Sequence, residues 1–156
     1  MPDIKVAVVR GTAPATTGTL DFTSTGFGTP KAAVFFLLYS PGADGVANQA
    51  NFHRSIGFTD GTSDHAVIVA SQDAQSTSNT RRKMNDNIAA GRINSSNSSN
   101  LEYGQFNSWV TDGVRLDWTV TSSATPEVVC VLFGGDDLQA KVGTIDAVDG
   151  TSTTSP

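Results

Sequence analysis

The amino-acid sequence predicts an all-β fold, a jelly-roll-like antiparallel β-sandwich of about nine short strands. Three observations carry this prediction. Short segments alternate between apolar and polar residues at a period of two, as half-buried strands do. Asp-Gly pairs, which favour tight turns, recur between these segments. The composition of 38% hydrophobic and 16% charged residues, with 15 glycines, also departs from that of a coiled coil or long helix.

Each strand is predicted from its own apolar pattern. Val114, Leu116 and Trp118 share one face of the clearest half-buried strand, so Trp118 is expected in the core. The run Ala32–Tyr39 is apolar on both faces, as in a central strand that is covered on both sides. A change of parity near Gly104-Gln105 indicates a bulge. In chain order, the predicted strands are Ile4–Val9, Leu20–Phe22, Ala32–Tyr39, Phe52–Phe58, His65–Ser71, Leu101–Val110, Val114–Val120, Glu127–Phe133 and, with the weakest pattern, Leu138–Asp146.

Turn residues connect these strands. Asp60-Gly61 predicts a hairpin between the fourth and fifth strands, and Asp112-Gly113 predicts one between the sixth and seventh. The polar run Asn94–Asn100 is expected to be an exposed loop. Helix is disfavoured throughout, and Thr80–Ala90 is the only segment that could form a helical turn.

The length fits one domain over residues 1–148, followed by an extended polar tail over residues 149–156. The tail has almost nothing to bury, so on its own it is expected to be disordered. A neighbouring subunit or another protein would hold it, by strand addition or in a groove. The residues predicted to make this contact are Asp149, Gly150, Thr151, Ser152, Thr153, Thr154, Ser155 and Pro156.

A basic cluster is the second predicted contact. Arg81, Arg82 and Lys83 hold three of the ten positive charges. They would bind an acidic partner surface or an anionic polysaccharide. The alternative is an exposed loop whose charges are tied to Asp73 or Asp86.

Charge and hydropathy exclude other partners. The net charge of −5 and the pI near 4.7 argue against nucleic acid. No apolar run approaches the roughly 18 residues of a membrane span. No secretory signal is seen at the N-terminus, so synthesis in a cytosol is expected.

The residue types that usually act in catalysis or metal binding form no recognisable motif in this sequence. Cys130 lies in an apolar run and is expected to be a buried hydrophobe. His53 and His65, near two aspartates, are too few for a recognisable zinc site, so no metal or cofactor is expected. No nucleophile elbow or phosphate loop is present. The chain is therefore expected not to be an enzyme, although Glu102 and Glu127 could converge as a glycosidase pair.

Three aromatic side chains could instead stack on a sugar ring, although core packing is the favoured interpretation. These are Tyr39, Tyr103 and Trp109.

The strand pattern also predicts self-association. Several edge strands carry little charge, and such edges invite pairing with another chain. The two-sided apolar run Ala32–Tyr39 exceeds what one small sandwich covers. A symmetric homo-oligomer is expected, with a trimer as the favoured state and more than about 1,000 Å² buried per contact.

The order of several segments resembles a domain that recurs in virion proteins of tailed bacteriophages, notably phages of marine bacteria. These segments are Gly26–Phe36, Ser55–Gly61, Ser76–Arg82, the strand of Trp118, and Leu132–Gly143. The resemblance covers roughly residues 4–146, and its motifs are turns and strand starts rather than catalytic residues.

The resemblance implies a non-enzymatic virion structural protein, because similar β-sandwich domains serve as capsid cement, head spikes or tail modules. A stand-alone domain resembles a capsid decoration protein, with the major capsid protein as its partner. The alternative is a receptor- or carbohydrate-binding module of a tail or head spike that recognises a host surface glycan.

Overall fold

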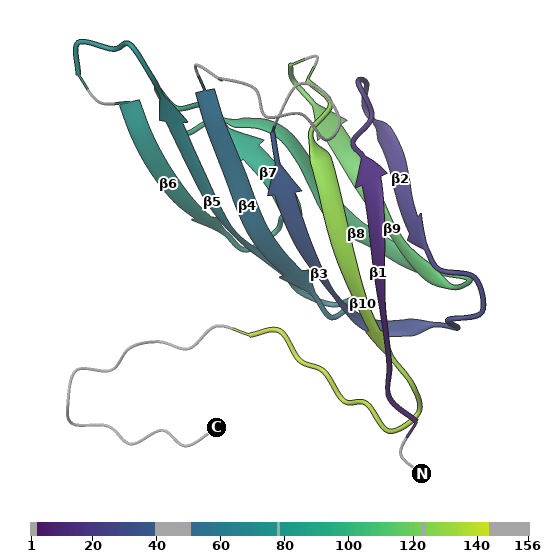
Figure 1. Cartoon of the computed structure of the whole chain (residues 1–156). Helices are drawn as coiled ribbons and strands as arrows, with labels where there is room; N and C mark the ends of the chain where they lie inside the picture. The colour runs from purple at the N-terminus through teal and green to yellow at the C-terminus, as the bar shows by residue number, and fades with distance from the viewer. Residues whose placement is uncertain (1–2, 40–50, 78, 123, 144–156) are drawn as a thin grey trace, which may run out of the picture.

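The chain is an antiparallel β-sandwich, which confirms the predicted fold class. The computed structural model describes residues 3–39, 51–77, 79–122 and 124–143, and these contain ten strands and no helix. Figure 1 shows the two sheets packed face to face. Within the described residues there is accordingly no helix long and apolar enough to cross a membrane.

The strands divide into a six-stranded and a four-stranded sheet. The large sheet has the order β1-β10-β3-β4-β5-β6, and the small sheet has the order β2-β9-β8-β7. Early and late strands pair in both sheets, β1 with β10 and β2 with β9, while β3 to β6 form a meander. The strand bounds are β1 (Lys5–Thr12), β2 (Gly18–Thr23), β3 (Pro30–Leu38), β4 (Asn51–Thr59), β5 (Asp64–Gln72), β6 (Asn79–Asn85), β7 (Ala90–Ile93), β8 (Asn100–Val110), β9 (Gly113–Val120) and β10 (Glu127–Gly134).

The core lies between the two sheets. Trp118 is 1% exposed, as predicted, and packs in one cluster with Phe22, Phe35 and Leu116. The rings of Phe22 and Phe35 meet edge to face across the sheets, with their centroids 5.7 Å apart. Burial of such large side chains supplies most of the driving force for folding.

A glycine allows the chain to pass from one sheet to the other. A Cβ at Gly57 in β4 would lie 1.8 Å from the carbonyl oxygen of Ala89. Only glycine therefore lets residues 88–90 pack this closely beneath the large sheet. This contact places β7 at the edge of the small sheet, against β4 and β5.

Both predicted hairpins are confirmed, since β4 pairs with β5 and β8 pairs with β9. The helical turn considered for Thr80–Ala90 is wrong, because residues 79–85 form β6 and pair with β5. An exposed edge strand needs no apolar face. The sequence of β6 is mostly polar, so it shows no alternation that would predict a strand. The four-residue β7 was also missed, being too short to show a period.

Three further expectations need correction. The bulge in β8 lies between Phe106 and Ser108 rather than at Gly104-Gln105. In the predicted strand Leu138–Asp146, residues 138–143 are not strand, and residues 144–146 lie outside the described residues. The β3 run is covered on one face only, because Phe36 and Leu38 are exposed. The tail, residues 149–156, lies outside the described residues.

Candidate functional site

The outer face of the large sheet is apolar. Val129, Phe36, Ile56, Val67 and Met84 lie directly opposite one another on β10, β3, β4, β5 and β6. They form one unbroken row across five strands. Since opposite residues in antiparallel strands point to the same side, all five side chains face away from the core.

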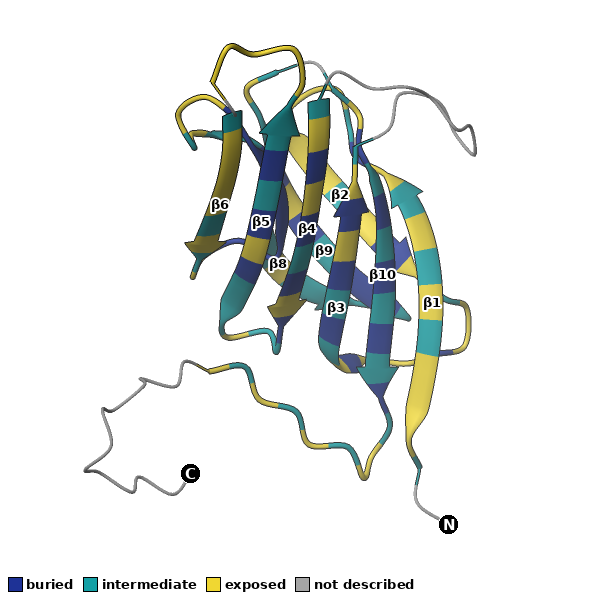
Figure 2. Ribbon diagram, turned by 60° about the vertical axis from the view of Figure 1, so that its left-hand side comes forward, coloured by how far each residue is buried: buried dark blue, intermediate teal, exposed yellow. Residues whose placement is uncertain are grey.

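A second apolar row runs beside the first. Val8, Val131, Val34 and Phe58 are aligned on β1, β10, β3 and β4. We call these nine residues, together with Leu38, the outer apolar face. Figure 2 shows the large sheet from this side, with half-buried and exposed positions between the buried ones.

Solvent reaches this face directly. Met84 is 76% exposed and Val8 is 68% exposed. The exposed fractions of Phe36, Phe58 and Val67 are each about half that of Met84 or more. A single exposed apolar residue is ordinary on a protein surface, but a contiguous patch marks an interaction site.

The outer face of the small sheet is polar by contrast. Arg115 on β9 donates two hydrogen bonds of 2.7 Å to the carboxylate of Asp21 on β2. The Arg115 guanidinium lowers the pKa of Asp21 below its usual value. Asp117 accepts a hydrogen bond of 2.9 Å from the Asn107 amide on the same side. The outer face of the large sheet is therefore apolar, whereas that of the small sheet is polar and charged.

Charged residues border the outer apolar face at one end of the sheet. Glu127, Leu38, Arg54, Val69 and Arg82 make up its next row. The Nε of Arg10 on β1 donates a hydrogen bond of 3.0 Å to Glu127. The centre of the face thus carries no charge, whereas this end is rich in arginine.

The structure divides the predicted basic cluster between two sides of β6. Arg81 donates a hydrogen bond of 3.1 Å to the carbonyl of Ser96, and the Nζ of Lys83 lies 2.8 Å from the Asn100 side-chain oxygen. Arg82 points the opposite way, onto the outer side of the large sheet, because neighbouring residues in a strand alternate. The alternative of an exposed loop is therefore wrong, because Arg81, Arg82 and Lys83 lie in strand β6. Only Arg82 shares a surface with the outer apolar face.

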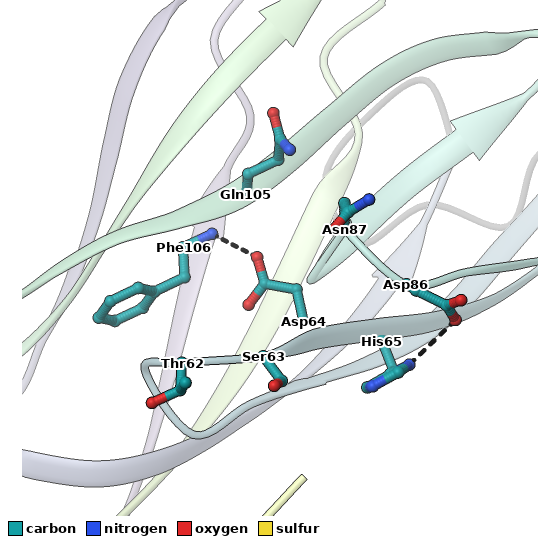
Figure 3. A pocket seen from close by; sticks show the side chains of 8 residues that line it. All are labelled: Thr62, Ser63, Asp64, His65, Asp86, Asn87, Gln105 and Phe106. Carbon is teal, nitrogen blue, oxygen red and sulfur yellow. Dashed lines mark hydrogen bonds and ion pairs between the residues drawn. The ribbon is translucent and has the colours of Figure 1, made fainter. Parts of the chain in front are cut away.

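A polar pocket of about 390 Å³ opens between the β4–β5 turn and β8. Figure 3 shows its lining: Asp64 accepts a hydrogen bond of 2.7 Å from the backbone NH of Phe106, and the Nδ1 of His65 lies 3.1 Å from an oxygen of Asp86. The other carboxylate oxygen of Asp64 is buried without a partner. Asp64 and Asp86 point in different directions, so the pocket does not gather its carboxylates on one point.

The two histidines considered as metal ligands do not meet. His53 is 4% exposed and faces the core, whereas His65 lies on the outer side at the opposite end of the same hairpin. Within the described residues, no group of three or more histidine, cysteine or acidic side chains is placed to hold a metal ion.

A second pocket, of about 490 Å³, is lined in part by Arg92, which belongs to a buried ion pair that sequence reasoning missed. The Nε of Arg92 on β7 lies 2.5 Å from a carboxylate oxygen of Glu102 on β8. The Nη2 of Arg92 donates to the hydroxyl of Ser122 at 3.0 Å, and that hydroxyl also contacts Glu102. The guanidinium lies 4.1 Å from the centre of the Tyr39 ring. The two residues are ten positions apart, and no pattern in the sequence indicated that they pair.

His53 lines the same pocket. Burial, together with the nearby charge of Arg92, lowers the pKa of His53 below 6.5. Its Nδ1 is buried without a hydrogen-bond partner. The neutral ring therefore holds a buried acceptor nitrogen beside the pocket.

The other chemistry-bearing residues stay apart. Cys130 is buried, and burial raises the pKa of its thiol. Glu102 is buried beside Arg92, whereas Glu127 lies on the outer side of the large sheet. The two glutamates therefore face no common cavity. The rings of Trp109 and Phe106 pack together with centroids 4.9 Å apart, and Tyr103 packs against the core around Ile68.

Comparison with known proteins adds little to this geometry. No family model matches the chain, and no curated protein matches it. A solved structure, the tailspike protein of Acinetobacter phage vB_ApiP_P1, matches 85% of this chain at 11% identity and a TM-score of 0.32. The match covers 21% of the tailspike, so the chain spans about a fifth of its length. A likeness this distant carries no argument about function.

Proposed function

We propose that this chain is a non-enzymatic structural protein of a bacteriophage virion, most simply a capsid decoration or cement protein. The observation that carries the proposal is the outer apolar face. A subunit that works inside an assembly can expose such a face, because another surface covers it there. The resemblance of residues 4–146 to virion domains supplies the phage context.

The magnitude of the hydrophobic effect supports an assembly role. Removal of apolar surface from water lowers the free energy by about 25 cal/mol per Å². The nine strand positions of the two rows, taken with Leu38, lie side by side on one sheet. A surface of this kind attracts a partner, or other copies, far more strongly than the polar face of the small sheet.

The proposed partners are other virion proteins such as the major capsid protein. The tail, Asp149–Pro156, and the basic cluster, Arg81–Lys83, remain the proposed points of attachment. Of these, Arg82 lies beside the outer apolar face. Contact through that edge of the sheet would combine apolar burial with the charge of an acidic partner.

The alternative function is a receptor- or carbohydrate-binding module of a tail or head spike. One observation favours it, namely the pocket around Arg92. Tyr39, His53, Asn94 and Gln72 are among the residues that line that pocket. Aromatic rings with neutral hydrogen-bonding groups are the groups that recognise sugars. A glycan array that returned a specific ligand, lost on Tyr39→Ala, would favour this alternative.

Copy number tests the proposal. Quantitative mass spectrometry of purified virions would compare this chain with the major capsid protein. A decoration protein is expected at a simple fraction of the capsid copy number. A few copies per particle would indicate a spike or tail part instead, and complete absence from virions would overturn the structural role.

A further inference from the structure

The outer apolar face is exposed in the single chain, and burial against another surface would stabilise it. We propose that a second copy of this chain covers it, so that two large sheets pack face to face about a two-fold axis. The inference rests on the proposed structural role, and it adds the identity of the partner at this face.

The size of the large sheet as a whole fits such a contact. Six strands span five spacings of about 4.8 Å, and about eight residues at about 3.3 Å each give the length, so the sheet measures roughly 24 by 26 Å. That is roughly 600 Å², and stable interfaces use about 800 Å² of accessible surface per partner. One sheet face thus nearly suffices for a stable dimer.

The shape of the face also favours a second copy. Large sheets pack naturally on other sheets, with about 10 Å between them and side chains from both filling the gap. The outer apolar face is centred on one sheet rather than split over two surfaces. A single patch of this kind makes an isologous pair about a two-fold axis. A closed trimer, the state favoured from the sequence, would need two different patches on each copy.

The charges at the two ends of the large sheet set the direction of pairing. Arg54 and Arg82 lie at the end where β10 begins. Asp86 and Asp136 lie just beyond the opposite end, after β6 and β10. A two-fold axis that runs across the strands brings the arginine end of one copy to the aspartate end of the other. An axis along the strands would set arginine against arginine, which like charges oppose.

The chain's own C-terminal part is the competing occupant. The backbone NH of Val142 donates a hydrogen bond of 3.0 Å to Asp60, so the segment after β10 passes along the end of the sheet. Lys141, Val142 and Gly143 border a cavity of about 400 Å³ together with Phe58 and Val67. This segment lies beside Phe58 and Val67 at one part of the face, and five residues of the two rows remain exposed, namely Val8, Phe36, Phe58, Val67 and Met84.

The test is the mass of the full chain in solution. Sedimentation velocity at micromolar concentration is expected to give twice the 16.3 kDa of one chain. Val67→Lys places a charge in the central row and is expected to weaken the dimer at least about 100-fold, because a charge at the centre of an apolar interface finds no partner. Thr19→Lys adds the same charge to the outer side of the small sheet and is expected to leave the dimer unchanged.

A second variant guards against misfolding. Should Val67→Lys lose the folded circular-dichroism spectrum, Met84→Lys at the exposed edge strand repeats the test with less risk to the core.

Arg82→Glu is expected to weaken the dimer, and Asp86→Arg added to Arg82→Glu is expected to restore it. Restoration would support the crossed direction of pairing.

Other outcomes overturn the inference. A stable monomer, or a trimer, would contradict the two-fold pairing. A monomer that becomes a dimer on deletion of residues 144–156 would show that the chain's own C-terminal segment is the occupant. These results are independent of copy number in virions: a monomer abundant in virions overturns only this inference, whereas a dimer absent from virions overturns only the proposed function.

Discussion

Arg92 and Glu102 form a buried ion pair in which the guanidinium Nε lies 2.5 Å from the carboxylate. The pair joins β7 to β8, so it anchors the shortest strand of the sandwich at the edge of the small sheet. Tyr39, at the end of β3, covers the guanidinium from the large sheet. One charged contact thus connects two consecutive strands with the end of β3, which is far from them in the sequence.

The first prediction concerns this pair. Glu102→Gln leaves the buried guanidinium of Arg92 without its counter-charge, and breaking a buried pair in this way costs about 3–5 kcal/mol. Urea denaturation should show a lower midpoint. The matched control is Asp21→Asn, which breaks the exposed pair with Arg115 and is expected to cost far less. Equal losses of stability in Glu102→Gln and Asp21→Asn would contradict a special role for the buried pair.

The second prediction concerns Gly57. Gly57→Ala is expected to destabilise the fold strongly, because its Cβ would lie 1.8 Å from the Ala89 carbonyl oxygen and the backbone at 88–90 would have to move. Thermal unfolding measures the loss. Gly18→Ala provides the control, since its Cβ would meet only the Thr16 oxygen, 4.0 Å away. An unchanged melting temperature for Gly57→Ala would show that β4 does not approach this segment.

The third prediction concerns pH. The pKa of His53 is lowered in the folded state, so the unfolded chain binds a proton more readily below pH 6.5. The contribution of His53 to stability is therefore full above pH 6.5 and is lost as the pH falls through its folded pKa. His53→Asn is expected to flatten the decline in unfolding free energy below pH 6.5. The same change at His65 should leave the decline in place, and a slope that persists in His53→Asn would contradict the prediction.

The fourth prediction concerns attachment to particles. Deletion of Asp149–Pro156 is expected to leave the melting temperature unchanged but to lower occupancy on undecorated particles. Arg81→Glu with Arg82→Glu is expected to lower occupancy less, and chiefly at low salt, because ions screen exposed charges. Occupancy across a salt series measures both effects. Wild-type occupancy of the tail-deleted protein would show that another surface makes the contact.

Local patterns in the sequence were sufficient for much of the fold. The alternation around Trp118 places that side chain in the core, and the Asp-Gly pairs at Asp60 and Asp112 identify both hairpins. Cys130 is buried as its apolar neighbours indicate. These features follow from residues that are close in the chain, so period and turn chemistry determine them.

Only the tertiary structure decided which apolar faces are covered. The run Ala32–Tyr39 reads the same whether its second face lies in a core or in solvent, and the sheet leaves Phe36 and Leu38 exposed. The polar strand β6 forms because β5 offers it an open edge. The pairing of Arg92 with Glu102 likewise depends on how β7 and β8 come together. Coverage and long-range pairing are set by contacts between distant segments, and no local period records them.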